Sequence, residues 1–203
     1  MSARVEPDTD IPCDMLPYDQ VYPTQWNLKN KVNTGFYGIG VNYPWCRGYG
    51  AGGRIGIIDA PFPSHSEIAP NVQGGDPLCS SPSVNCSTHG MACASVAAAA
   101  RQNTGMVGVA PDAAIVPVLF ASTDPDEDDI INTVWRVPLL LSGTSPAVVS
   151  MSWHMHAEEF AGDLKEAVRA VVDSAGIPFF CSTSSESYPG FWDQGNPNTA
   201  DRL

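Results

Sequence analysis

The alternation of short apolar runs with segments carrying helix signals is the feature that most constrains the fold of this chain. The apolar runs have the length and composition of buried strands, and a helical segment separates each from the next. The expected strands are 54–59, 115–120, 147–152 and 177–182, and the expected helices are 88–101, 126–136 and 158–174. Units of this kind form right-handed crossovers between parallel strands. We therefore expect a three-layer α/β fold, with a mainly parallel sheet and helices on both faces.

Charge and hydropathy exclude two classes of partner. The 203 residues include 22 Asp and Glu and 10 Lys and Arg, which gives a net charge of −12. Such a charge repels nucleic acid and anionic membrane surfaces. The longest stretch of small apolar residues, 91–100, is too short and too weakly hydrophobic to span a bilayer. We expect no nucleic-acid or membrane partner, and because Met1 is followed by no apolar signal region, the localisation stays open.

Two residues of catalytic type are placed to meet at one edge of this sheet. Asp59 ends the first expected strand, and His89 lies at the start of the helix that follows about thirty residues later. Polar groups that follow parallel strands gather at the carboxyl edge of the sheet, where α/β proteins build their sites. A carboxylate that orients an imidazole is one half of a Ser-His-Asp triad. The alternative is that the two residues have unrelated structural roles.

Three other patterns have ordinary structural interpretations. Residues 48–53 match the letters of the dinucleotide fingerprint, but a strand follows them and none precedes them, so we reject this cofactor. The acidic run 124–129 lacks the spacing of a calcium-binding loop, and we interpret it as a solvated loop in which Asp126 or Asp128 caps the next helix. His154 and His156 have no third metal ligand placed by the sequence, and we interpret them as loop residues.

The six cysteines do not follow a zinc-binding pattern. Cys79 and Cys86 lie seven residues apart in a Pro- and Ser-rich loop that is sterically compatible with a disulfide. Cys93 lies one turn along the helix from His89. A thiol near a helix start can be reactive, but a position inside a buried helix favours an inert core cysteine. We therefore expect no metal site among the cysteines or at the catalytic residues.

Several segments, in order along the chain, correspond to the motifs of one protein family. They are 25–30, 54–59, 64–68, 88–95, 105–111 and 148–153. These segments resemble motifs of the subtilisin-like serine peptidases (subtilases). In the same order, they correspond to the opening of the catalytic domain, the aspartate motif, the residues after that motif, the histidine motif, the Gly-Val-Ala-Pro turn and the strand that lines the substrate cleft. The resemblance extends from about residue 20 to residue 190. With 54–59 and 64–68 counted as one motif, it comprises five consecutive matches, which are far more specific than any one of them.

The resemblance implies a role for each matching residue. Asp59 would fix the tautomer of His89 and stabilise its imidazolium form, and His89 would be the general base toward a serine. Ser152, Trp153 and His154 would pair their main chain with an extended peptide substrate. Ser185 stands where the family has its oxyanion-hole asparagine. The chemistry needs no cofactor, while the resemblance implies a structural calcium and a secreted protein.

The chain departs from the family pattern at the nucleophile. The family serine belongs to a later Gly-Thr-Ser-Met-Ala helix start, and this sequence ends at Leu203 before such a segment. The Gly-Thr-Ser at 143–145 precedes an expected strand, at the amino end of the sheet, whereas Asp59 lies at the carboxyl end. We interpret Ser145 as a turn residue. Further departures are Ala60-Pro61 after the aspartate, Met91-Ala92 after the histidine, and Ser185 in place of asparagine.

These observations predict an extended N-terminal arm at 1–18 and, at 19–203, the N-terminal two-thirds of a subtilisin-like peptidase domain, incomplete on its C-terminal side. The implied function is a serine endopeptidase that cleaves polypeptides through an acyl-enzyme. Its serine would come from beyond Leu203, on a C-terminal fragment or a second chain. The alternatives are an inactive pseudoprotease that serves as a peptide-binding or regulatory scaffold, and an acyl transferase that forms macrocyclic peptides.

Overall fold

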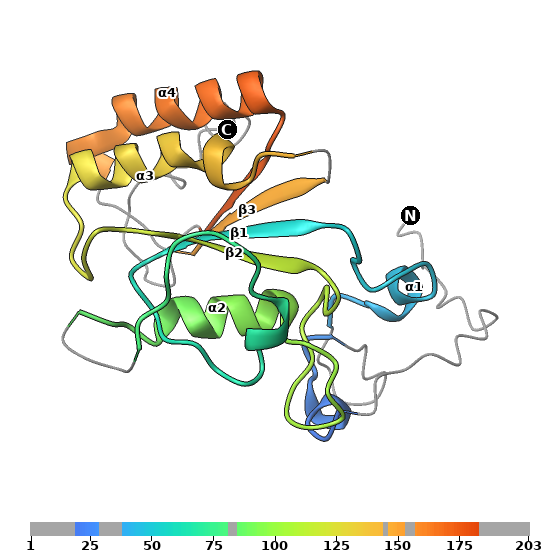
Figure 1. The fold of residues 1–203 in the computed structure, drawn as a ribbon. Helices are drawn as coiled ribbons and strands as arrows, with labels where there is room; N and C mark the ends of the chain where they lie inside the picture. Colours follow the sequence, from blue (N-terminus) through green and yellow to red (C-terminus); the bar gives the residue numbers. More distant parts are fainter. Residues whose placement is uncertain (1–18, 29–37, 81–84, 144–145, 153–156, 183–203) are drawn as a thin grey trace.

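A four-stranded parallel sheet forms the centre of the molecule (Figure 1). The computed structural model describes residues 19–28, 38–80, 85–143, 146–152 and 157–182. The strands are β1 (Arg54–Asp59), β2 (Ala114–Leu119), β3 (Ala147–Met151) and β4 (Phe179–Cys181). Their order is β2-β1-β3-β4, and every neighbouring pair is parallel. The predicted α/β architecture is therefore confirmed, and it places the ends of β1, β2 and β3 side by side at one edge.

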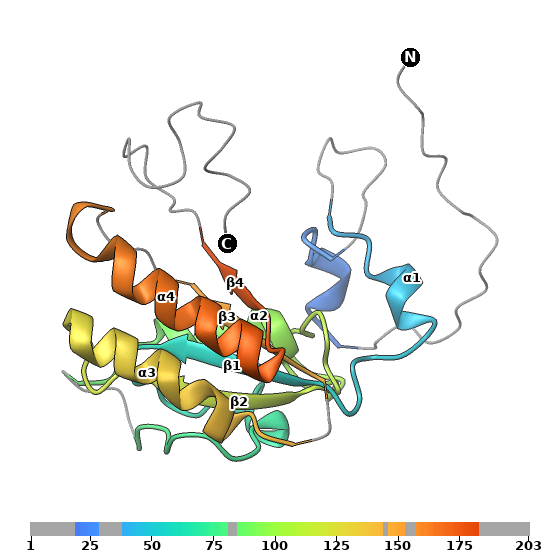
Figure 2. The same ribbon diagram turned by 90° about the horizontal axis from the view of Figure 1, so that it is seen from above.

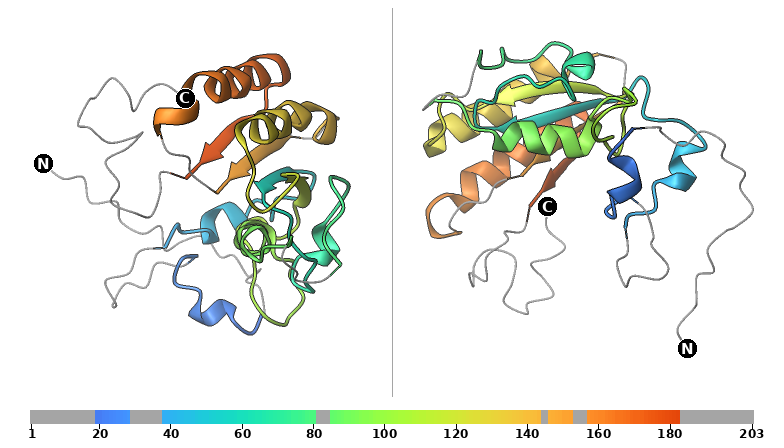
Figure 3. Two further views of the ribbon diagram at one scale, coloured as in Figure 1. Left: turned by 90° about the vertical axis from the view of Figure 1, so that its left-hand side faces the viewer. Right: turned by 90° about the horizontal axis from the view of Figure 1, so that it is seen from below.

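Helices cover both faces of the sheet. Helices α3 (Glu127–Leu140) and α4 (Ala157–Ala175) lie side by side on one face, and α2 (His89–Ala98) lies on the other (Figures 1, 2 and 3). Successive residues of a strand point to opposite faces, so Ile58 packs in the core beneath α3 and α4 while Ile57 packs in the core beneath α2. This two-sided burial explains why the apolar run of β1 is continuous rather than alternating.

The N-terminal part of the described chain packs against the turn that follows α2. It contains the short elements η1 (Tyr22–Thr24) and α1 (Asn42–Trp45). The Gln25 side chain donates to the Val107 carbonyl at 2.8 Å and accepts from the Val107 N–H at 3.0 Å. These paired hydrogen bonds fix residues 22–25 on that turn. The predicted arm at 1–18 lies outside the described residues.

The acidic loop before α3 has the structural role predicted for it. The Asp126 side chain accepts from the Asp129 N–H at 2.9 Å, and the Asp129 carboxylate accepts from the Ala121 N–H. Asp126, rather than Asp128, is therefore the N-cap of α3.

Two predicted helix ends were wrong. Helix α3 continues past Arg136 through Pro138, because Val137 and Leu141 are fully buried in the core that the helix covers. Helix α2 ends at Ala98 instead of residue 101, since the next residues leave the helix to hydrogen-bond with other loops, as when the Ala100 N–H donates to the Glu67 carbonyl.

The last expected strand, 177–182, is shorter in the structure. Within the described residues β4 comprises Phe179–Cys181 and pairs with β3 alone. A third short element, η2 (Ala69–Asn71), follows β1 on the side of α2. None of the helices in the described ranges combines the length and the apolar character needed to cross a membrane.

Candidate catalytic site

A buried carboxylate lies at the carboxyl edge of the sheet. Asp59 is the last residue of β1, which β2 and β3 flank on both sides, and only 3% of the residue is exposed. One carboxylate oxygen accepts from the Ala60 N–H at 2.9 Å, and the other bonds to His89 Nδ1 at 2.8 Å. The structure thus brings together the two residues whose meeting the sequence predicted.

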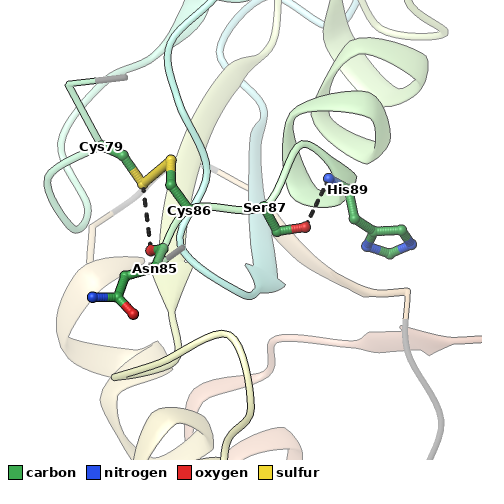
Figure 4. The surroundings of a disulfide bond; sticks show 5 residues. All are labelled: Cys79, Asn85, Cys86, Ser87 and His89. Carbon is green, nitrogen blue, oxygen red and sulfur yellow. Dashed lines mark hydrogen bonds between the residues drawn. A yellow bond between two sulfur atoms is a disulfide. The ribbon is translucent and has the colours of Figure 1, made fainter. Parts of the chain in front are cut away.

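Residues just before α2 hold His89 in place. The Ser87 hydroxyl accepts from the His89 N–H at 3.1 Å (Figure 4), and the Ser87 N–H donates to the Pro61 carbonyl at 2.7 Å. Thr88 is the N-cap residue of α2, but its side chain makes no capping hydrogen bond, and the Ser87 hydroxyl satisfies a helix-start N–H instead. Ser87 therefore links the start of α2 to the loop that follows Asp59.

A disulfide makes a second connection between the same two loops. Cys79 and Cys86 are bonded, as their spacing allowed, with their Cα atoms 6.2 Å apart (Figure 4). The Cys79 N–H donates to the Phe62 carbonyl at 3.0 Å. The segment after the aspartate and the segment before the histidine are thus cross-linked through covalent and main-chain bonds.

A glycine allows α2 to approach β1 closely. A Cβ atom at Gly90 would lie 2.4 Å from Phe62 Cδ1 and 2.8 Å from Asp59 Cβ, which is closer than real Cβ atoms come. Any side chain at this position would push the helix start away from Asp59. In the sequence, Gly90 appears only as part of the 88–95 histidine motif, and its packing role was not predicted. The signal that could have predicted it is the glycine directly after His89.

The two members of the pair have contrasting environments. Burial raises the pKa of the Asp59 carboxyl, and the charge and hydrogen bond of His89 act in the opposite direction. The Asp59 side chain is 4% exposed, whereas the His89 side chain is 54% exposed. An ionised carboxylate only accepts hydrogen bonds, so in the neutral imidazole Nδ1 carries the proton and Nε2 has a free lone pair. This geometry suits a general base whose tautomer is fixed by the hydrogen bond from Nδ1 to Asp59.

Cys93 lies against the imidazole. Its sulfur is 3.9 Å from both His89 ring nitrogens, and the Ser152 side chain lies close enough to lower the pKa of the thiol. Burial raises the pKa of the Cys93 thiol, which suits a protonated and unreactive group. The residue packs against the core under α2 without being fully buried. The sequence interpretation of an inert cysteine fits its protonation but did not anticipate its contact with His89.

The structure describes only part of the remaining predicted site. Ser152 follows β3 and lies beside Cys93, so it reaches the same edge as the Asp59–His89 pair. Trp153, His154 and Ser185 lie outside the described residues, as do His156 and Ser145.

The neighbours of Ser145 are described. The Pro146 carbonyl accepts from the Arg54 N–H, at the end of β1 opposite to Asp59. This arrangement agrees with the expectation that the Gly-Thr-Ser at 143–145 belongs to the amino end of the sheet.

Two carboxylates outside the catalytic pair each have a buried oxygen atom that lacks a hydrogen-bond partner. They are Asp19 Oδ2 and Glu67 Oε2. Both residues contact the turn after α2: Asp19 Oδ1 accepts from the Gln102 N–H, and Glu67 Oε1 would lie 1.7 Å from a Cβ atom at Gly105. Buried carboxylate oxygens of this kind are the ligands that calcium prefers.

Comparisons with known proteins agree with this architecture. The subtilase family model matches residues 50–200. The fold is similar to that of a cold-adapted subtilisin-like serine proteinase, with 23% identity, a TM-score of 0.51 and coverage of 65% of this chain and 46% of that one. For a serine protease of Aeromonas sobria the identity is 21% and the TM-score is 0.57, and the match covers 78% of this chain and 30% of that one. For MycP1 with its N-terminal propeptide removed the identity is 15% and the TM-score is 0.54, and the match covers 91% of this chain and 55% of that one.

These comparisons also show how much of each protein the match covers. The chain spans between 30% and 55% of the length of the three solved structures named here. A search of curated proteins found no match. The family model covers about three-quarters of the chain and includes both Asp59 and His89. The chain therefore belongs to the subtilase family.

Proposed function

We propose that this chain supplies the aspartate and histidine of a serine endopeptidase of the subtilisin class. One observation carries the proposal: a buried carboxylate and a half-exposed imidazole are joined by a 2.8 Å hydrogen bond at the carboxyl edge of a parallel sheet. Such a pair activates a serine hydroxyl in acyl-transfer enzymes. The proposed nucleophile is a serine outside residues 1–203, on a continuation of the polypeptide or on a second chain.

The proton transfers follow from the orientation of His89. Its Nδ1–H donates to Asp59, so its Nε2 can take the proton of the serine hydroxyl as the oxygen attacks the peptide carbonyl. Asp59 stabilises the resulting imidazolium, which then gives the proton to the leaving amine. Water, activated by the same Nε2, hydrolyses the acyl ester and restores the serine. In this reaction Asp59 remains ionised throughout.

The proposed substrate is an extended polypeptide. Ser152 follows β3, the strand next to β1, and lies beside Cys93, whose sulfur contacts the imidazole, so a peptide lying along residues 152–154 would pass the reactive nitrogen. Main-chain pairing with Ser152, Trp153 and His154 would bind the peptide as an added strand. Ser185 would donate a hydrogen bond to the oxyanion, in place of the family asparagine.

Labelling of the full-length protein by a fluorophosphonate probe tests this proposal, together with hydrolysis of a denatured protein substrate. The wild-type protein should be labelled, and Asp59→Asn should lower kcat by on the order of 10⁴ because it removes the carboxylate that orients the imidazole. Asp128→Asn is the matched control, since Asp128 is exposed in the first turn of α3 and should leave kcat unchanged. Equal losses in both variants would contradict the proposal.

The second candidate is a pseudoprotease that binds peptides without cleaving them. The departures from the family motifs, Met91-Ala92 and Ser185, favour it. Both candidates predict peptide binding, but only the enzyme reacts with the fluorophosphonate. A full-length protein that binds an extended peptide, remains unlabelled and releases no product would establish the pseudoprotease.

We also propose that Asp19 and Glu67 hold a structural calcium ion against the turn after α2. The support is that each residue contacts this turn and has one buried carboxylate oxygen without a hydrogen-bond partner. Calcium should raise the midpoint of thermal unfolding of the wild-type chain, and Glu67→Gln should abolish that rise. A rise of equal size in the variant would exclude Glu67 as a ligand.

A further inference from the structure

The catalytic pair belongs to a larger group of potential metal ligands. Asp59, His89 and Cys93 each offer one ligand atom, and these atoms all lie within 4.8 Å of one another. In the part of the chain that the structure describes, no other set of three His, Cys, Asp or Glu side chains comes so close together. The thiol has no part in the proposed peptidase reaction, so its position beside the imidazole needs another explanation.

The three ligand types are those that zinc prefers. Zinc binds cysteine sulfur at about 2.3 Å, histidine nitrogen at about 2.0 Å and carboxylate oxygen at about 2.0–2.2 Å, usually in a tetrahedron. A tetrahedral ion with these bonds separates sulfur from nitrogen by roughly 3.5 Å and nitrogen from oxygen by roughly 3.4 Å. In the structure the corresponding distances are 3.9 Å from Cys93 Sγ to His89 Nδ1 and 2.8 Å from Nδ1 to Asp59 Oδ2. Movements of about half an ångström would convert one arrangement into the other.

The environment permits both this movement and the approach of an ion. The His89 side chain is 54% exposed, so the ring can shift, and Cys93 is half-buried rather than enclosed. His89 and Cys93 are four residues apart on α2, so their side chains share one face of the helix. The buried Asp59 carboxylate and a Cys93 thiolate together supply two negative charges, which match a divalent cation and offset the positive end of the helix dipole.

We propose that Asp59, His89 and Cys93 form a binding site for a zinc ion, which takes the place of the proton between His89 and Asp59. The ion forms bonds to Asp59 Oδ2, His89 Nδ1 and Cys93 Sγ, and water is its fourth ligand. The thiol proton is released to solvent, and the proton of Nδ1 moves to Nε2, so the imidazole stays neutral. A protonated Nε2 cannot act as a base. If the chain functions as proposed above, zinc therefore switches the peptidase off reversibly.

Binding to the 203-residue chain can be measured without any enzymatic activity. Isothermal titration with Zn²⁺ should show one site, and Co²⁺ should produce a thiolate-to-cobalt charge-transfer band in the near ultraviolet. Cys93→Ser should weaken Zn²⁺ binding at least tenfold and remove the band. Cys181→Ser is the matched control, because Cys181 is the other free cysteine of the described residues, and it should change neither measurement. Far-UV circular dichroism of both variants verifies that they are folded.

Three results would overturn the proposal: no cobalt–thiolate band in the wild-type chain, Zn²⁺ binding of unchanged affinity in Cys93→Ser, or loss of the band in Cys181→Ser. The link to activity is tested separately in the full-length protein. Zn²⁺ should reduce fluorophosphonate labelling of the wild type, a zinc-selective chelator should restore it, and Cys93→Ser should be insensitive. A protein that binds Co²⁺ through Cys93 but is never labelled would retain the metal site and refute the peptidase function.

Discussion

Replacing Gly90 with alanine tests whether close packing of α2 against β1 positions the catalytic pair. The new methyl group would lie 2.4 Å from Phe62 Cδ1 and 2.8 Å from Asp59 Cβ. Neither neighbour can move freely, since Phe62 is fully buried in the core under α2 and Asp59 is held at the end of β1. The helix start would have to move outward and carry His89 with it.

Two opposing effects set the magnitude. Alanine is favoured over glycine inside a helix by about 1 kcal/mol. Overpacking of a well-filled core costs about 1–3 kcal/mol, and the two contacts fall well inside the roughly 3.5–4.0 Å of a favourable carbon–carbon approach. The overpacking should dominate, so Gly90→Ala should lower the free energy of unfolding by up to about 2 kcal/mol.

A second helical glycine provides the matched control. Gly162 lies in α4, and a Cβ atom there would meet nothing within 4 Å. Gly162→Ala should therefore raise the free energy of unfolding by about 0.5–1 kcal/mol, from helix propensity alone. Urea unfolding followed by circular dichroism measures both variants, and proton NMR reports the hydrogen-bonded Nδ1–H of His89. If Gly90→Ala were as stable as Gly162→Ala and kept this proton signal, the positioning argument would be refuted.

Three further changes address other parts of the fold. Replacing Cys79 and Cys86 with serine should lower the free energy of unfolding by about 2.5 kcal/mol, the chain-entropy value for so short a loop, and an unchanged urea midpoint would show that the disulfide contributes nothing. Asp126→Ala should cost about 1 kcal/mol in urea unfolding through loss of the α3 cap, and the cap is excluded if the exposed Asp128→Ala costs as much. Because burial raises the pKa of Asp59, the folded state binds more protons than the unfolded state just above the ordinary carboxyl pKa, and stability falls as pH rises through that window. The melting temperature of Asp59→Asn relative to wild type should therefore increase from acid to neutral pH, and a constant difference would contradict this sign.

The strands and the layer arrangement could be predicted because their signals are local. An apolar run such as 54–59 reports its own burial on both faces, and the crossover rule then fixes parallel pairing. The ends of elements depend on tertiary contacts instead. Pro138 argues for an early end of α3, but burial of Val137 and Leu141 outweighs the hydrogen bond lost at the proline.

Within the site, too, the features set by local sequence could be predicted, and those set by tertiary contacts could not. Asp59 and His89 are the end of a strand and the start of the next helix, so topology alone brings them to one edge. At the start of α2 the Ser87 hydroxyl, and not that of Thr88, accepts a helix-start N–H. Which of the two hydroxyls does so depends on a one-residue difference in where the chain turns. The contact of Cys93 with Ser152 depends on how α2 packs against the sheet, which no local pattern encodes.

The residues that position the catalytic pair all lie between β1 and α2. The Ser87–Pro61 hydrogen bond, the Cys79–Cys86 disulfide and the close approach at Gly90 join the loop after the aspartate to the segment before the histidine. These contacts involve no residue beyond position 90, so the 2.8 Å hydrogen bond forms independently of any nucleophile. A preorganised pair minimises the reorganisation needed when a serine arrives. The same preorganisation presents Asp59 and His89 to a metal ion that Cys93 can capture, so the feature that favours catalysis also makes the site open to inhibition by zinc.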